Sequence, residues 1–498
     1  MNGVNQTIPP HTFGDTLAQK ISMEELDECI KDLVNGVSAA ADGIPNEFIK
    51  NSKAKMRIAL LDFFNFILDS GHVVLEWNIG IMFLLHKKDD RTILKNYRGI
   101  TINPNISKLF ARIMLNRLIS VVDSEKMLGE FQGATRSGRH TTDNIFILSV
   151  MIEKARRNKW KDTAAAFIDM RKAYDMVDRE KLWSVLEEKG INGKFLSLLK
   201  SMYEESEIWV DINGSRTQEP IRPERGLKQG CVLSPILFSL YMNDLGRVLQ
   251  ETKLGVTIAD TNISCLMFAD DICLIGRDYK SLLTLIEKTQ DYADKYGLEI
   301  NPEKSEIVRL YEDDNNLNWP LRNSEGILLA DLKQVLKYKY LGVPISFQHN
   351  NIFKCRVSDV LIRANQFVGR IKSMSKESFN RVEVAEALWE NVAIPALTYG
   401  IECMHLTKSE LDKLEASQRN LAKWILGHSR NAAGIAAITE LGWKSMQHRY
   451  EMKKVLMFGR LKYDKEIGQS WWVKKAFEEA QAQKSNRWWC DVVELTNN

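Results

Sequence analysis

The spacing of apolar residues divides the chain into a first part that mixes helices with strands and a last part that is helical. In "SMEELDECIKDLVNGV" (22–37) apolar residues fall three and four positions apart, which predicts a helix. Ser22 with Glu25 predicts a capping box at its start. The same pattern predicts helices over 56–71, 105–125 and 179–190, and strands over 79–88, 162–170 and 207–214. The segment 265–276 is also strand-like and is predicted to fold back on itself.

From Phe353 onward, helical spacing dominates in "RVSDVLIRANQFVGRIKSM" and in the segments 381–400, 409–427 and 448–466. The change of character near residue 345 predicts a domain boundary. The predicted fold class is α+β. The expected organisation is an N-terminal extension (1–60), a mixed domain (61–345), a helical domain (346–440) and a helical tail (441–498).

Composition narrows the class of protein. The hydrophobic fraction is 44% and the charged fraction 27%, which is typical of soluble globular chains. No apolar run approaches the roughly 18 residues needed to cross a membrane, and the first twenty residues lack a signal-peptide pattern. We therefore expect an intracellular protein with no membrane partner. The seven cysteines form no C-x-x-C pair, which argues against a zinc knuckle or a disulfide framework.

Two adjacent carboxylates interrupt the apolar stretch "CLMFADDICLIG". Asp270 and Asp271 repel each other, and a buried ionised carboxylate is costly unless a cation offsets it. Asp169 likewise follows an apolar strand, "AAAFI". If the two strands are neighbours, three carboxylates converge on a site suited to Mg²⁺. Taken alone, an Asp-Asp pair in a hairpin is more often turn chemistry.

The order of the segments resembles that of reverse transcriptases. "FIDMRKAYDMVD", "GLKQGCVLSPILFSLYMNDL", "FADD", "YADKYGLEINPEKSEIV" and "YKYLGVPI" are similar to the family's successive A to E motifs. "FADD" and the upstream "NYRGITINPNISKLFARIMLNRL" resemble the non-LTR (LINE-type) retrotransposon branch, as does "AAADGIPNEFIK". The resemblance implies a right-hand polymerase in which 61–345 forms fingers and palm and 346–440 forms the thumb.

The resemblance also implies a catalytic centre with two Mg²⁺ ions, for which Mn²⁺ is an alternative. By matching position, Asp169, Asp270 and Asp271 would hold the ions, and the main-chain carbonyl of Met170 would be a further ligand. Lys304 matches the lysine proposed to protonate the departing pyrophosphate. Without the family motif, Lys304 would be read equally well as an exposed turn residue.

Five further positions match the family's substrate-binding residues. Tyr174 matches the steric gate whose ring excludes a 2′-hydroxyl. Gln229 and Gly230 match residues that pack against the nucleotide and the templating base. Arg98 matches the fingers arginine that grips the triphosphate, since a guanidinium offers a rigid fork to phosphate oxygens. Lys87 matches its companion lysine, although the lysine that follows it is an alternative.

Three segments depart from the usual pattern of the branch. Asp42 lacks the preceding Gly-Pro, Gly99 stands where proline is customary, and Ala134-Thr135 replaces Gly-Phe. All three lie in the predicted fingers or N-terminal extension. They indicate a divergent lineage or a decaying copy.

The hypothesis is an RNA-directed DNA polymerase that copies an RNA template from a DNA or RNA primer with dNTPs, in retrotransposition. The sequence contains no visible endonuclease constellation, so a separate endonuclease is an expected partner. The alternatives are a decayed, nucleic-acid-binding relative, an intron maturase-like protein, and an RNA-dependent RNA polymerase, against which Tyr174 argues. Tryptophan pairs in the tail can stack on single-stranded bases or pack together, and packing is the preferred interpretation.

Overall fold

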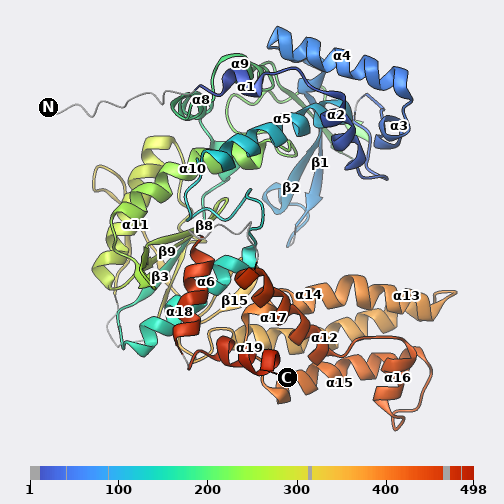
Figure 1. The fold of residues 1–498 in the computed structure, drawn as a ribbon, viewed down its shortest axis with the longest axis vertical. Coiled ribbons are helices and arrows are strands. Elements are labelled where there is room, and N and C mark those ends of the chain that lie inside the picture. The colour runs from blue at the N-terminus through green and yellow to red at the C-terminus, as the bar shows by residue number, and fades with distance from the viewer. Residues whose placement is uncertain are drawn as a thin grey trace. The chain divides into compact units, whose positions relative to one another are not determined.

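The computed structural model describes residues 12–40, 42–87, 89–212, 214–311, 317–463, 471–483 and 485–497. The chain divides into two compact units and passes between them several times. The first unit contains Met1–Arg136, Met170–Arg247 and Gln290–Ile300, and the second contains Ser137–Asp169, Val248–Thr289 and Asn301–Asn498. Figure 1 shows the chain as a ribbon and labels many of its helices and some of its strands.

Several helices of the first unit begin or end at the residues that the sequence indicates, although the helix predicted over 22–37 already ends at Lys31. Ser22 Oγ accepts a hydrogen bond from Glu25 N while the Glu25 carboxylate accepts one from Ser22 N, which confirms the capping box. Gly71 ends the next long helix with a φ of +73°. Asp178 caps its helix by accepting from Lys181 N. These helices are α1 (Gly14–Leu17), α2 (Met23–Lys31), α3 (Asn46–Lys50), α4 (Ala54–Ser70), α5 (Asn105–Ser124), α7 (Ala173–Met176), α8 (Arg179–Glu188) and α9 (Gly193–Ser201), with the 3₁₀ turns η1 (Leu75–Asn78) and η2 (Leu94–Asn96).

A four-stranded sheet is the other component of the first unit. Its order is β2-β1-β4-β5, with β1 antiparallel to β2 and parallel to β4. Aromatic rings pack beside it: Phe64 lies 5.2 Å and Trp77 5.4 Å from Phe110 between ring centroids. The strands are β1 (Ile79–His86), β2 (Tyr97–Ile102), β4 (Glu207–Ile212) and β5 (Ser215–Arg216).

The second unit is built on a five-stranded sheet in the order β13-β10-β3-β9-β8. β3 is central and fully buried, which explains its unbroken apolar sequence, and it is antiparallel to both β9 and β10. Helix α6 (Thr141–Arg157) packs against β8, and α18 (Trp472–Ala482) packs against α6 (Figure 1). The strands are β3 (Ala164–Ile168), β8 (Cys265–Phe268), β9 (Asp271–Gly276), β10 (Glu306–Arg309) and β13 (Lys333–Gln334).

Short hairpins and two long helices complete the mixed region. Leu341 and Gly342 both have positive φ, +44° and +83°, as a two-residue hairpin loop between β14 and β15 requires. Two helices join the units: α10 (Ser234–Glu251) begins in the first unit, and α11 (Tyr279–Tyr296) begins in the second. The hairpin strands are β6 (Val256–Ile258), β7 (Thr261–Ile263), β11 (Pro320–Arg322), β12 (Leu328–Asp331), β14 (Tyr338–Tyr340) and β15 (Val343–Ile345).

The helical character predicted after residue 353 is confirmed. The indole rings of Trp389 and Trp443 stack with centroids 5.9 Å apart inside this region's apolar core, and Trp389 Nε1 donates to Gln418. The elements are α12 (Lys354–Ser375), α13 (Arg381–Leu388), η3 (Trp389–Ala393), α14 (Ile394–Thr398), η4 (Ile401–Cys403), α15 (Lys408–Ile425), α16 (Gly434–Glu440), α17 (Met446–Tyr463), α18 and α19 (Arg487–Asn497).

The segment 381–400 is not the single α-helix that its pattern predicts. One π-helical turn, Trp389–Ala393, separates α13 from α14. Pro395 is the second residue after this turn, and proline has no N–H to donate to a carbonyl in the preceding turn. The interruption leaves the apolar face of the segment buried, which is why the spacing of apolar residues did not reveal it.

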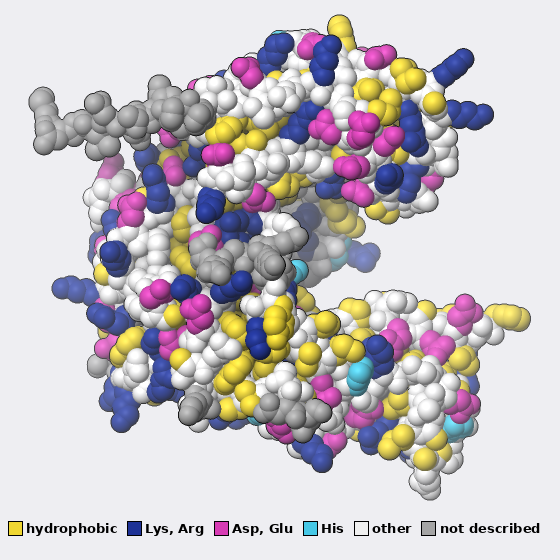
Figure 2. Space-filling view, viewed as in Figure 1, with side chains coloured by type: hydrophobic (Ala, Val, Ile, Leu, Met, Phe, Trp, Pro, Cys, Tyr) yellow, Lys and Arg dark blue, Asp and Glu magenta, His cyan; other side chains and the backbone are white. Residues whose placement is uncertain are grey.

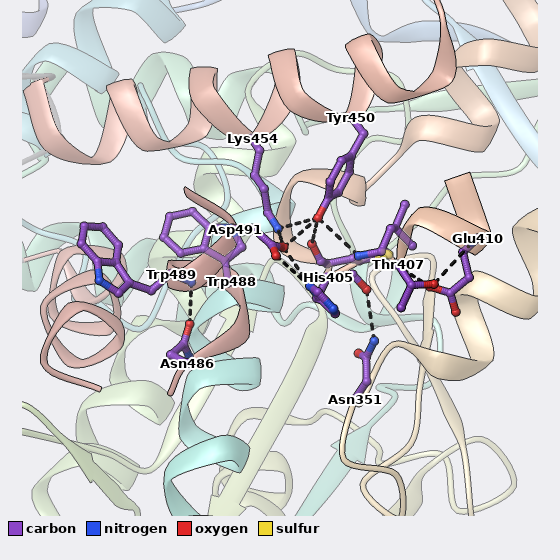
Figure 3. A network of polar contacts seen from close by, with 12 residues as sticks. Asn351, His405, Thr407, Glu410, Tyr450, Lys454, Asn486, Trp488, Trp489 and Asp491 are labelled. Carbon is purple, nitrogen blue, oxygen red and sulfur yellow. Dashed lines mark hydrogen bonds and ion pairs between the residues drawn. The ribbon is translucent and has the colours of Figure 1, made fainter. Parts of the chain in front are cut away.

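A polar network joins α17 to α19 inside the second unit (Figure 3). The Asp491 carboxylate accepts from the hydroxyl of Tyr450 at 2.8 Å, contacts His405 Nδ1 at 2.8 Å, and pairs with the fully buried ammonium of Lys454. Burial would raise the pKa of Asp491, but the hydrogen bond with His405 and the charge of Lys454 hold it below its usual value. Trp488 Nε1 donates to the Glu402 carbonyl beside this network.

The tail is packed against the second unit. Trp471, Trp472 and Trp488 are each no more than 5% exposed, so the interpretation of the tryptophan pairs as packing residues is confirmed for these three. Glu479 of α18 pairs with Lys154 of α6 at 2.7 Å. Among the described residues, every helix is too short or too polar to cross a membrane.

Candidate active site

Three carboxylates lie at one end of the central strands of the second unit. The register pairs Ile168 of β3 with Ile272 of β9, so the next pair along the two strands is Asp169 opposite Asp271. Directly opposed residues on antiparallel strands have Cβ atoms about 5 Å apart. Asp270 occupies the tight turn between β8 and β9, next to Ala269, whose φ is +54°. The convergence predicted from the sequence is therefore present, and both hairpin aspartates are exposed.

The electrostatics reflect this crowding. Although part of the Asp271 side chain is exposed, desolvation by the protein atoms around its carboxylate, followed by the negative charges of Asp270 and Asp169, raises the pKa of Asp271 from its ordinary value of 3.8 to about 6. The strained backbone of Ala269 lies at the same turn, and strain of this kind clusters at functional sites. Together these features indicate carboxylates arranged for a cation rather than for the stability of the hairpin.

Three residues of the segment 301–305 contact Asp169. Asn301 Nδ2 donates to Asp169 Oδ2 at 3.1 Å, and Asp169 N donates to Ser305 Oγ at 3.1 Å. Lys304 Nζ lies 3.7 Å from Asp169 Oδ2, so the structure places this predicted residue at the carboxylates. Asn301 and Ser305 were not predicted as site residues. Their signal was the Asn-Pro turn inside "INPEKSEI", but nothing local indicates which strand end the turn contacts.

The donor set suits a hard divalent cation, since it offers only oxygen atoms and a concentrated negative charge. No group of three or more histidine, cysteine, aspartate and glutamate side chains in the described part of the chain is arranged closely enough to hold a metal ion by itself. A site of this kind takes substrate phosphates among its ligands. The residues therefore fit Mg²⁺ in chemistry and charge, with part of the ligand shell left to the substrate.

Met170 belongs to the first unit and forms a backbone bridge with Ile300. Two backbone hydrogen bonds flank this bridge. Asn301 N donates to the Asp169 carbonyl at 2.8 Å, and Arg171 N donates to the Glu299 carbonyl at 2.7 Å. The Met170 carbonyl takes part in neither. That arrangement is compatible with the predicted role of the carbonyl as a metal ligand.

The first unit brings the predicted nucleotide-binding residues of motifs A and B together. The ring of Tyr174 stacks on Phe238 with centroids 4.6 Å apart, and its carbonyl accepts from Leu227 N at 2.8 Å. Gln229 Nε2 donates to Asp175 Oδ1 at 2.7 Å. Tyr174 and Gln229 therefore lie on two segments that are bound to each other. Asp175 was not predicted and gives no signal by itself, because an exposed aspartate in a turn is common.

Gly230 has a backbone that only glycine adopts without strain. Its φ is +92°, and an added Cβ would lie 2.5 Å from the carbonyl oxygen of Thr101. The family match and the steric requirement therefore agree on glycine at this position.

Replacing Gly230 by alanine is expected to destabilise the first unit by about 1–3 kcal/mol, because it adds backbone strain and a clash with a main-chain atom. Thermal unfolding measures the loss. Gly214→Ala is the matched control, since Gly214 has a φ of +89° with no atom near the position of its Cβ. Equal losses in the two variants would show that the contact with Thr101 costs nothing.

The predicted triphosphate-binding residues lie on one hairpin of the first unit. Arg98 is opposite Leu85, and Lys87 N donates to the Asn96 carbonyl at 2.8 Å just beyond the paired region. Because side chains alternate along a strand, Lys87 and Arg98 lie on the same face of this hairpin. Both are exposed. The alternative, Lys88, lies outside the described residues.

Charge over the surface does not by itself mark a nucleic-acid interface. On the face shown in Figure 2, Lys and Arg side chains are interspersed with Asp and Glu rather than gathered into one patch. The assignment of a site therefore depends on the aspartates and the nucleotide-binding residues rather than on a basic surface.

Comparison with known proteins identifies the family. The family model described as "Reverse transcriptase (RNA-dependent DNA polymerase)" matches residues 85–345, which is more than half of the chain. The chain belongs to this family. The predicted fold class is confirmed: the chain is α+β, the neighbouring strands β8, β9, β3 and β10 are antiparallel, a helical region follows them, and the family is one of right-hand polymerases.

Relatives of this chain come from mobile elements. It is 28% identical over 451 residues to a protein of transposon TX1 from Xenopus laevis, covering 85% of this chain and 31% of that protein. It is 25% identical over 423 residues to the RNA-directed DNA polymerase from mobile element jockey of Drosophila melanogaster, covering 82% and 44%. The predicted non-LTR branch is confirmed. The chain spans less than half of the length of these relatives.

Solved structures of telomerase match this chain more distantly. Apo telomerase from Candida tropicalis has 13% sequence identity and a TM-score of 0.41, covering 85% of this chain and 73% of that one. Telomerase from Candida albicans, in complex with a fragment of telomeric RNA, has 10% identity and a TM-score of 0.41, covering 84% and 66%.

Proposed function

We propose that this chain is an RNA-directed DNA polymerase that extends a primer 3′-hydroxyl along an RNA template, using dNTPs. The observation that supports the proposal most is the register of β3 and β9, which sets Asp169 opposite Asp271 with Asp270 beside it. The reaction would form one phosphodiester bond and release pyrophosphate. Residues 61–345 would form fingers and palm, 346–440 the thumb, 1–60 an N-terminal extension and 441–498 a tail.

Asp169, Asp270, Asp271 and the carbonyl of Met170 would hold two Mg²⁺ ions, with Mn²⁺ as an alternative. Ions bound there would lower the pKa of the attacking hydroxyl and stabilise charge on the leaving oxygen. Lys304, 3.7 Å from Asp169, would hold the proton that the departing pyrophosphate needs. The aspartates therefore supply the ligands, and the lysine supplies an acid at the same strand ends.

The first unit would bind the nucleotide. Arg98 and Lys87 would neutralise the triphosphate, with the guanidinium forming paired hydrogen bonds to phosphate oxygens. Gln229 and Gly230 would pack against the base pair being formed. The ring of Tyr174, held by its stacking on Phe238, would exclude a 2′-hydroxyl from the sugar position.

Primer extension on an RNA template, with and without Mg²⁺, tests the proposal. Incorporation of dNTPs that depends on the metal is expected, and binding of template should weaken with salt because it depends on backbone phosphates. Preferential use of rNTPs would instead favour an RNA polymerase. No incorporation with either Mg²⁺ or Mn²⁺ would favour the decayed, binding-only alternative, and stimulation of intron splicing would favour a maturase-like protein.

Replacing Tyr174 by alanine is expected to reduce the preference for dNTPs over rNTPs by about tenfold or more, since a steric pocket discriminates by roughly this factor. The measurement is kcat/KM for dATP and ATP on the same primed RNA. Tyr174→Phe is the matched control, because it keeps the ring and removes only the hydroxyl. If the ratio of kcat/KM for dATP and ATP is unchanged in Tyr174→Ala, Tyr174 is not the steric gate.

The proposed biological role of this polymerase is in retrotransposition. The relatives belong to mobile elements, so the reaction would serve retrotransposition inside the cell, primed at a nick in target DNA. A separate endonuclease would make that nick. Purified chain and an RNA template test polymerisation alone, and addition of a nicked duplex tests whether the nick is accepted as a primer.

A further inference from the structure

A cavity of about 540 Å³ lies within the first unit. Its walls come from β1, β2 and β4, from the start of α8, and from the loop 221–229. Gln229 and Asp175, which are hydrogen-bonded to each other, also line it. None of the three aspartates proposed for catalysis contributes to this lining. The volume falls within the range of roughly 300–1,000 Å³ that is typical of small-molecule sites.

Two cations on the cavity wall have neutral hydrogen-bond partners in the part of the chain that the structure describes. Arg179 Nε donates to the carbonyl of Gly226 at 3.0 Å, and Lys228 Nζ donates to Asn78 Oδ1 at 2.8 Å. Both lie near the ring of Tyr203, at 5.1 and 5.8 Å from its centroid. Among the described residues, no carboxylate oxygen lies within 4.0 Å of either cation. Their positive charges are therefore not compensated by an ion pair.

Holding these cations together is unfavourable without an anion. Burial lowers the pKa of Lys228 to about 8, the charge of Arg179 contributes to the lowering, and burial also lowers the pKa of Arg179. Asp175 and Glu224 also line the cavity, but the Asp175 carboxylate accepts from Gln229, and Glu224 is exposed. A ligand carrying negative charge would offset the two desolvated cations.

The rest of the lining suits an organic group. Apolar side chains of Met82, Ile208 and Pro223 line the same cavity. Thr101 also lines it, and its buried hydroxyl has no hydrogen-bond partner within the described part of the chain. Buried polar groups are nearly always hydrogen-bonded in proteins, so we expect this hydroxyl to form a hydrogen bond with a molecule bound in the cavity. The cavity therefore combines a cationic end, an apolar wall and one unsatisfied hydroxyl.

We propose that this cavity binds a small phosphorylated organic molecule of the nucleoside monophosphate class, with its phosphate between Arg179 and Lys228 and its organic part on the apolar wall. Because Gln229 and Asp175 line the cavity, an occupant would reach the hydrogen bond that holds the Gln229 side chain. Occupancy would then alter nucleotide binding. This last consequence rests on the proposed function, whereas binding itself does not.

Thermal unfolding of the full chain with AMP, adenosine or inorganic phosphate tests the proposal. AMP is expected to raise the unfolding temperature, adenosine to leave it unchanged, and phosphate alone to raise it less, because a ligand that binds only the folded state stabilises that state. Lys228→Met should bind AMP about tenfold more weakly or worse, since a charge-assisted hydrogen bond is lost. Methionine keeps the apolar stem and removes an uncompensated charge, so this variant should fold.

Two controls separate this site from others. Lys194→Met removes an equal charge from an exposed position on α9 and should keep the full effect of AMP. Arg98→Met removes the proposed triphosphate contact and should also keep it. The proposal is overturned if AMP does not stabilise the unmutated chain, if it stabilises Lys228→Met equally, or if Arg98→Met abolishes its effect. Equal effects of AMP and inorganic phosphate would overturn the role of the apolar wall.

Discussion

Replacing Asp270 by alanine is expected to abolish dNTP incorporation, with a loss of at least ~10³-fold in kcat, or about 4 kcal/mol of barrier. Asp270 lies in the turn that follows β8, beside Asp271 and the end of β3. It would provide part of the charge that holds the divalent ions, and no neighbouring group can replace a carboxylate in that role. Single-turnover primer extension in saturating Mg²⁺ measures the loss.

The affinity for primed RNA shows whether Asp270→Ala has lost only the catalytic step or has also lost its folded structure. Asp270 is exposed, so alanine leaves no cavity, and affinity for primed RNA should stay within about twofold of the unmutated chain. Asp291→Ala is the matched control, because it removes an exposed aspartate from α11. If Asp270→Ala incorporates dNTPs nearly as fast as the control, Asp270 does not hold a catalytic metal ion, and the proposed mechanism is wrong.

Replacing Asp491 by alanine is expected to destabilise the second unit by about 3–5 kcal/mol, because a buried cation would lose its partner. The Lys454 side chain is 0% exposed, and its remaining contact in the network is the Tyr450 hydroxyl at 2.6 Å. Burial already lowers the pKa of Lys454 to about 8 even with the carboxylate present. The loss should appear as a lower unfolding temperature and as faster hydrogen exchange in α17 and α19.

A double variant identifies why Asp491→Ala loses stability. Asp491→Leu combined with Lys454→Met replaces the ion pair by apolar groups of similar size, which is often neutral in other proteins. It should recover most of the stability that Asp491→Ala loses. Asp412→Ala, at an exposed site on α15, is the control and should change stability by less than about 0.5 kcal/mol. A double variant as unstable as the single one would show that the packing of α19, rather than the buried charge, is responsible.

Local signals in the sequence predicted most of the elements correctly. The capping box of Ser22 and Glu25, the helix end at Gly71 and the buried strand before Asp169 all appear where their residues indicate. The segment 265–276, predicted to be strand-like and folded back on itself, is a hairpin with a two-residue turn at Ala269 and Asp270, so this prediction is confirmed. These features depend on contacts within a few residues, so the residues that decide them are adjacent in the chain.

Sequence alone determined the class of this protein, because five motifs in a fixed order name a family even when each one is common. The tertiary structure alone decided the contacts between segments far apart in the chain: Asn301 and Ser305 at Asp169, Asp175 at Gln229, and the network in which Asp491 pairs with Lys454. It also revealed the cavity, whose lining comes from five separate stretches between residues 78 and 229. Local patterns specify which elements form and which face is apolar. Which side chains meet across the fold depends on how those faces pack, and no short stretch of sequence records that.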